Sequence, residues 1–158
     1  MNILLAGFTG NDNSAKLILD KASPRFQKLY LENDFDICAE QIQTAILSFK
    51  YDFILALGQK PVIKSIYIET SARKFDTVIN SQYNYSAFAT HLNTYGFKTK
   101  ISINAGNYLC NHVYFHGLAA IDQVSSSSHL LFLHMPTIKN IPHINHLSST
   151  ISSFLETL

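Results

Sequence analysis

The sequence has few cysteines, little net charge and no long apolar run, and each of these shortages excludes a class of protein. Only Cys38 and Cys110 are cysteines, so no disulfide framework is expected and a reducing cytoplasm is the simplest setting. The formal net charge is +1 and no run of Lys or Arg stands out, so nothing predicts a nucleic acid or a membrane surface as a partner. No apolar stretch is long enough to span a bilayer, and residues 1–8 lack the basic start of a signal peptide.

The apolar residues that are present predict a single α/β domain. The chain has 158 residues and is 47% apolar, which is enough for one domain, 1–158, with its own core. Apolar runs predict strands at 3–6, 28–31, 51–57, 64–69, 98–103 and 130–133. Helical spacing predicts helices that begin at an Asn13 or Ser14 cap, at an Asp36 cap, near 85, near 107 and at 148. Segments 70–82 and 125–128 show no period and are predicted to be loops.

The alternation of these elements favours one architecture. Strands that are apolar on both faces and are separated by helices predict a mostly parallel sheet covered on both sides, in a three-layer α/β/α sandwich. Ligands bind such sheets beyond the carboxyl ends of the strands. Gln59, Glu69 and His134 lie near predicted strand ends, and Cys110 follows another strand in the chain. We therefore expect these four residues to gather at one edge of the sheet.

Cys110 is the candidate nucleophile, because it falls in the first turn of the helix predicted to begin near Asn107. Unpaired N–H groups and the positive end of the helix dipole favour an anion there. A thiol in that position is expected to ionise more readily, and the thiolate is the reactive form. The alternative is a buried structural cysteine with no chemical role.

Three residues together could perform nucleophilic catalysis. A cysteine hydrolase needs a sulfur, an imidazole that takes and returns a proton, and a group that orients the imidazole. Cys110, His134 and Glu69 are of these types, and the Cys110 N–H could face a developing oxyanion. The alternative is that His134 is a hydrogen-bonded core residue.

Two other patterns carry less weight. Glycines at 7 and 10 follow the first strand as in a phosphate-binding loop, but the third glycine of such a loop is missing and a tight turn explains the pair equally well.

Zinc binding needs more ligands than the histidines provide, and no H-E-x-x-H motif is present, so surface or hydrogen-bonded histidines are the simpler interpretation of His112, His116, His143 and His146.

Several motifs resemble those of pyroglutamyl peptidase I, a family of cysteine peptidases. Residues 102–115, SINAGNYLCNHVYF, resemble the family's nucleophile motif S-x-x-A-G-x-[YF]-[LV]-C-N-x-x-x-[YF]. Residues 132–136, FLHMP, resemble its F-[IL]-H-[VI]-P motif, which carries the catalytic histidine. Gly58 and Gln59, ahead of Glu69, resemble the segment with the substrate-binding glutamine and catalytic glutamate, and Gly7 and Phe8 match the start of the loop G-F-x-P-F-G.

The resemblance implies an activity and a site. Cys110 would attack the carbonyl that joins an N-terminal 5-oxoproline to the next residue, His134 would transfer protons, and Glu69 would orient His134. The residues expected to hold the substrate are Gln59, Phe8 and Leu109. The implied partner is a peptide with a blocked N-terminus, with no cofactor and no metal. Members of the family are often homo-oligomers, so a homo-oligomer is a further expectation.

The sequence also departs from the family pattern. The residues at 9–11 replace the part of the first loop that holds its second phenylalanine, and Arg73 stands near the place of a family asparagine. The segment between Glu69 and Cys110 is about twenty residues shorter than in typical members, so this would be a shortened and divergent member. Two alternatives stay open: a related cysteine hydrolase with a different acyl or amide substrate, and a non-catalytic relative that acts as a binding module.

Overall fold

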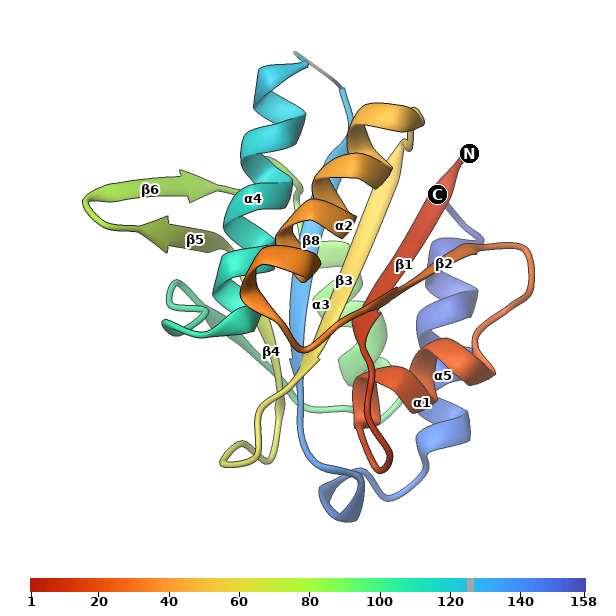
Figure 1. Ribbon diagram of the computed structural model, residues 1–158. Helices are drawn as coiled ribbons and strands as arrows, with labels where there is room; N and C mark the ends of the chain where they lie inside the picture. Colours follow the sequence, from red (N-terminus) through yellow and green to blue (C-terminus); the bar gives the residue numbers. More distant parts are fainter. Residues whose placement is uncertain (125–126) are drawn as a thin grey trace.

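The computed structural model describes residues 1–124 and 127–158 and places a six-stranded sheet between two layers of helices (Figure 1). The predicted α/β/α architecture is confirmed. In chain order the elements are β1 Ile3–Phe8, α1 Ser14–Lys21, β2 Gln27–Leu31, α2 Phe35–Ser48, β3 Phe53–Gln59, β4 Ile66–Glu69, β5 Ser71–Lys74, β6 Thr77–Asn80, α3 Ser86–Thr94, β7 Thr99–Ser102, α4 Leu109–Gln123, β8 His129–Met135, the short 3-10 helix Ile138–Asn140 and α5 Ile144–Leu155. None of the helices in this described part is long and apolar enough to cross a membrane.

The main sheet is mostly parallel, as the sequence predicts. Its strand order is β2-β1-β3-β8-β4-β7. All neighbouring strands run parallel except β4 and β8, which are antiparallel. In this register Gly58 lies beside His134, and Glu69 lies beside Phe132. The reversal of β4 therefore brings a carboxylate to the middle of β8 rather than to its end.

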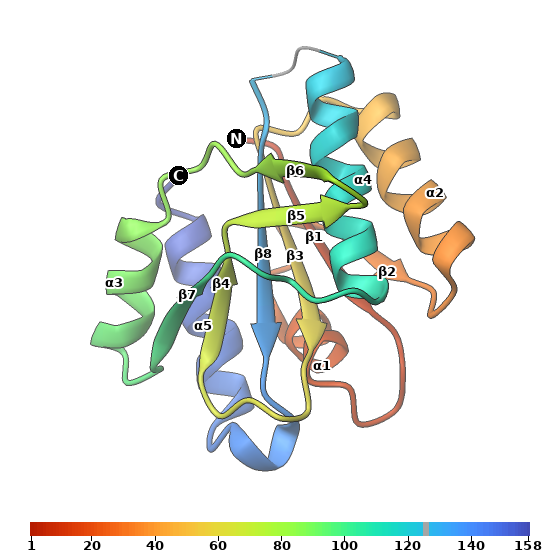
Figure 2. The ribbon, with the colours of Figure 1, turned by 90° about the vertical axis from the view of Figure 1, so that its left-hand side faces the viewer.

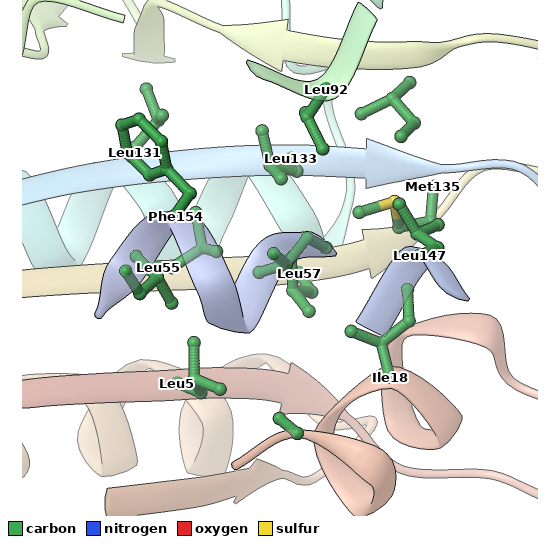
Figure 3. Close-up of a cluster of buried hydrophobic side chains, with 14 of the residues drawn as sticks. Leu5, Ile18, Leu55, Leu57, Leu92, Leu131, Leu133, Met135, Leu147 and Phe154 are labelled. Carbon is green, nitrogen blue, oxygen red and sulfur yellow. The ribbon is translucent and has the colours of Figure 1, made fainter. Parts of the chain in front are cut away.

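Helices cover both faces of the sheet because the side chains of each strand alternate between two cores. Leu131, Leu133 and Met135 of β8 point to the face covered by α1, α3 and α5 (Figure 3). Leu130 and Phe132 of the same strand point to the other face, where α2 and α4 pack. The inner strands are thus apolar on both sides, which accounts for their continuous apolar runs.

Local capping chemistry sets the helix starts. The side chain of Asn13 accepts hydrogen bonds from the N–H groups of Ala15 and Lys16, which confirms the predicted start of α1. The prediction of Asp36 as the cap of α2 is wrong, because Asp34 accepts from the N–H groups of Asp36 and Ile37. Helix α5 begins at Ile144, before the predicted start at 148, and makes no side-chain capping hydrogen bond at its start.

Segment 70–82 contains a hairpin, so the prediction of a loop is wrong. Strands β5 and β6 pair antiparallel, and Phe75 at their turn has a positive φ of 52°. The hairpin packs beside α4, outside the main sheet (Figure 2). Only Ser71 and Ala72 of its strand residues are buried, so the segment has no apolar stripe that a sequence pattern would reveal. In the predicted loop 125–128, residues 125 and 126 lie outside the described part of the chain.

Candidate active site

The absence of a side chain at Gly58 makes room for the Cys110 sulfur. A Cβ atom built on Gly58 would lie 2.4 Å from Cys110 Sγ and 3.0 Å from the Phe132 ring. Gly58 and His134 are register partners in adjacent parallel strands, about 5 Å apart, with their side-chain directions on one face of the sheet. The nucleophile candidate therefore packs onto the sheet beside the strand position that carries the imidazole.

His134 is held by Glu69. Its Nδ1 atom lies 2.7 Å from Glu69 Oε1, and both side chains are almost completely buried. This contact leaves the opposite ring nitrogen, Nε2, as the atom that can exchange a proton. The backbone oxygen of Glu69 accepts a hydrogen bond of 2.9 Å from the Tyr114 hydroxyl of α4, so the same helix supplies both Cys110 and a support for the carboxylate strand.

Glu69 reaches His134 by a different route from the one that the sequence suggested. We expected four residues at a common carboxyl edge, and Gln59 does end β3 while His134 is the penultimate residue of β8. Because β4 is antiparallel to β8, Glu69 lies opposite Phe132, and His134 is its diagonal neighbour on the same face. A long side chain spans that diagonal, so the expectation of a shared edge is wrong for Glu69.

The start of α4 presents free N–H groups, but it does not make Cys110 a thiolate. The helix begins at Leu109, and Tyr108 makes no capping side-chain hydrogen bond. The first N–H groups of a helix lack intrahelical partners and suit an anion. Burial nevertheless raises the pKa of the Cys110 thiol to about 12, and the nearby Cys38 and Glu69 add to the rise. The expectation of a lowered pKa is therefore wrong, because desolvation outweighs the helix terminus.

A small cavity lies beside Cys110. Its volume is about 100 Å³, and Cys110, Gln59, Phe8 and Leu109 all line it. The sequence thus identified residues that the structure brings together around one hollow. Phe8 and Leu109 are buried, and Gln59 Oε1 accepts a hydrogen bond of 2.9 Å from the Ser14 N–H, which fixes the amide at the cavity wall. His134 and Glu69 do not line this cavity.

Sequence reasoning missed other residues of the site. Asn13, Asn33 and Tyr108 also line the small cavity. Asn13 was predicted only as a helix cap, and the position of Asn33 just after β2 could have marked it as a strand-end residue. Asn111 was noted in the motif without a role, yet its buried side chain hydrogen-bonds both the N–H and the C=O of Arg73, at 2.9 and 2.7 Å. It fastens the hairpin to the first turn of α4.

Of the four histidines considered for zinc, His112 and His116 are neighbours on α4. The rings of His112 and His116 lie 4.4 Å apart between centroids, and Lys74 Nζ is 3.2 Å from His116 Nε2. A cation at that place disfavours a metal ion. Among residues 1–124 and 127–158, no group of three or more His, Cys, Asp or Glu side chains is arranged to hold one.

Comparisons with known proteins agree with the resemblance that the sequence indicates. Residues 79–156, which include Cys110 and His134, match the family model described as pyroglutamyl peptidase. A comparison with curated protein sequences gives no match. Among solved structures, the pyrrolidone carboxyl peptidase of Fervidobacterium islandicum AW-1 superposes with a TM-score of 0.83 at 19% identity, over 99% of this chain and 97% of that chain.

Two further solved structures extend this likeness. Pyroglutamyl peptidase I of Bacillus amyloliquefaciens gives a TM-score of 0.81 at 16% identity, over 96% of this chain and 92% of that chain. The pyrrolidone carboxyl peptidase of Thermococcus litoralis gives a TM-score of 0.78 at 18% identity, over 99% of this chain and 95% of that chain. The predicted resemblance is therefore confirmed, by sequence over residues 79–156 and by fold over almost the whole chain.

Proposed function

We propose that this chain is a cysteine peptidase of the pyroglutamyl peptidase family and that it removes 5-oxoproline from the N-terminus of peptides. One observation carries the proposal. The Cys110 sulfur packs against Gly58, the register partner of the Glu69-bound His134, and Cys110 also lines a cavity of about 100 Å³. Cys110 thus joins the cavity to the sheet position next to His134, which supports a nucleophile and a proton carrier at one end of the sheet.

In the proposed reaction, His134 takes the proton of the thiol while the sulfur attacks the substrate carbonyl. A raised thiol pKa requires this transfer, because little thiolate exists beforehand at neutral pH. The C–N bond then breaks, and His134 gives the proton to the departing amine. Water attacks the thioester, His134 takes the water's proton and returns it to sulfur, and 5-oxoproline leaves. Glu69 fixes the imidazole and offsets its positive charge in both halves.

The size and lining of the small cavity support 5-oxoproline as the acyl group. The cavity volume of about 100 Å³ suits one small ring rather than a longer chain. Phe8 and Leu109 supply apolar contact for that ring. The Gln59 carbonyl is engaged by Ser14 N–H, which leaves its amide N–H groups to donate to the lactam carbonyl.

The test compares a fluorogenic 5-oxoprolyl amide with the matching prolyl amide, which lacks the lactam carbonyl. We expect the wild type to hydrolyse only the first, and Cys110→Ala to hydrolyse neither. Cys38→Ala is the matched control, since it removes the other cysteine, which is buried in α2. Hydrolysis of other acyl amides in place of the 5-oxoprolyl amide would favour the related hydrolase, and no hydrolysis at all would favour the binding module.

A further inference from the structure

A larger cavity adjoins the one at Cys110 and carries positive charge. Its volume is about 690 Å³, and Tyr108 lines both cavities. Its walls come from the loop before α4, from the first turn of α4, from Phe35 of α2 and from the β5–β6 hairpin. Arg73 and Lys74 of the hairpin are among the lining residues, and no Asp or Glu is.

Neither cation of this cavity forms an ion pair within the part of the chain that the structure describes, although the carboxylate of Asp36 lies near His112. The ion pairs in residues 1–124 and 127–158 are Lys16 with Asp20 and His134 with Glu69, so Arg73 has no carboxylate partner there. Burial and the nearby Lys74 lower the pKa of His112, which keeps that ring neutral at pH 7. The cavity therefore presents the Arg73 guanidinium without a carboxylate partner, beside Lys74, whose Nζ lies 3.2 Å from His116 Nε2.

The backbone of Arg73 is fixed relative to the helix that carries Cys110, whereas Arg73 itself is exposed. Asn111, the residue after Cys110, accepts a hydrogen bond from Arg73 N–H and donates one to Arg73 C=O. These two bonds join the hairpin to the first turn of α4 in the way that a neighbouring strand would. The guanidinium is thus carried by a backbone anchored at the residue next to Cys110, and Arg73 lines the larger cavity.

A carbonyl that is attacked by Cys110 has two substituents, the acyl group and the leaving amine. If the small cavity holds the acyl ring, as in the proposed function on which this inference rests, then the leaving peptide passes Tyr108 into the larger cavity. We propose that Arg73, assisted by Lys74, binds a carboxylate on the amine side of the scissile bond, and so makes the enzyme selective for acidic leaving peptides. Arg suits this role because its planar fork binds a carboxylate through two hydrogen bonds.

That carboxylate has two sources, the C-terminus of a very short peptide or an acidic side chain. We would therefore measure kcat/KM for three 5-oxoprolyl substrates: 5-oxoprolyl-alanine, its C-terminal amide, and 5-oxoprolyl-glutamate with an amidated C-terminus. The wild type should prefer at least one acidic substrate over the neutral amide by about tenfold. Preference for the first acidic substrate identifies the C-terminus as the source, and preference for the second identifies the side chain.

The variant Arg73→Gln should bring the ratio of kcat/KM for the acidic substrate to kcat/KM for the neutral amide close to one, mainly by raising KM for the acidic substrate. Arg73→Lys should restore part of the wild-type ratio. Arg25→Gln is the matched control, because Arg25 is the other arginine of the chain and lies exposed between α1 and β2. It should keep the wild-type ratio. Equal kcat/KM for acidic and neutral substrates in the wild type, or an unchanged ratio in Arg73→Gln, would overturn this inference alone. Failure to hydrolyse any of the three would overturn the proposed function with it.

Discussion

Replacing Gly58 by alanine should disable the nucleophile while leaving the fold intact. The added Cβ would lie 2.4 Å from Cys110 Sγ, whereas atoms in van der Waals contact sit about 3.5–4.0 Å apart. The sulfur must therefore move by about 1 Å or more. It can do so by rotating about one side-chain bond, but the new methyl then occupies the space between the sulfur and the strand position of His134.

Gly58→Ala should raise the activation free energy of the reaction by more than it lowers the free energy of unfolding. A misplacement of about 1 Å in a reacting atom costs about a hundredfold in rate, which corresponds to about 2.7 kcal/mol of activation free energy. Overpacking of a core position lowers the free energy of unfolding by about 1–3 kcal/mol. The sulfur can move, but the new Cβ would also lie 3.0 Å from the buried Phe132 ring, so we expect Gly58→Ala in the middle of that range.

The assay is kcat/KM with a 5-oxoprolyl fluorogenic amide, together with the free energy of unfolding in urea. Gly117→Ala is the control. Gly117 lies in α4, seven residues after Cys110, and its added Cβ would lie 2.6 Å from Leu130 Cδ2 without touching Cys110. We expect this control to keep kcat/KM within about twofold of the wild type. Wild-type kcat/KM in Gly58→Ala, or an equal loss in both variants, would refute the account of how the sulfur is placed.

Three further predictions concern the residues around the sulfur. Glu69→Gln should lower kcat by about a hundredfold to ten-thousandfold with little loss of stability, because it removes the buried charge but keeps an acceptor for His134. Unchanged kcat would exclude a role for Glu69 in orienting the imidazole. The raised pKa of Cys110 means that its thiol stays neutral in the folded protein while the unfolded thiol ionises, so stability should fall as the pH rises from 9 to about 12. Urea titrations over that range should show a smaller fall for Cys110→Ala than for the wild type, and equal falls would contradict the burial of the thiol. Asn111→Ala should lower the free energy of unfolding by about 1–3 kcal/mol and raise amide hydrogen exchange in the hairpin, because it leaves backbone groups of Arg73 unpaired; unchanged exchange would show that the two hydrogen bonds do not hold the hairpin.

The sequence predicted those parts of the fold that rest on apolar pattern and capping. Each inner strand has apolar residues on both faces, as Phe132 and Leu133 show by entering different cores. That pattern predicted a covered, mostly parallel sheet, and the structure confirms it. Asn13 was also predicted correctly, because its side chain has the chemistry that a helix start requires.

The sequence did not predict features that depend on long-range pairing. Nothing in residues 66–69 shows that β4 runs antiparallel to β8, and only this reversal explains how Glu69 meets His134. The hairpin at 71–80 was missed because its strands are short and mostly exposed. The pKa of Cys110 was predicted in the wrong direction because helix position can be read from the sequence, whereas the degree of burial cannot.

The central claim is that Cys110 carries the 5-oxoprolyl group during the reaction. The most direct measurement is acid quenching during turnover of a 5-oxoprolyl amide, followed by mass spectrometry of the digested protein, with Cys110→Ala treated in parallel. We predict a 5-oxoprolyl thioester on the peptide that contains Cys110 and no turnover by Cys110→Ala. The acyl group on another residue, or turnover by Cys110→Ala at the wild-type rate, would contradict the account.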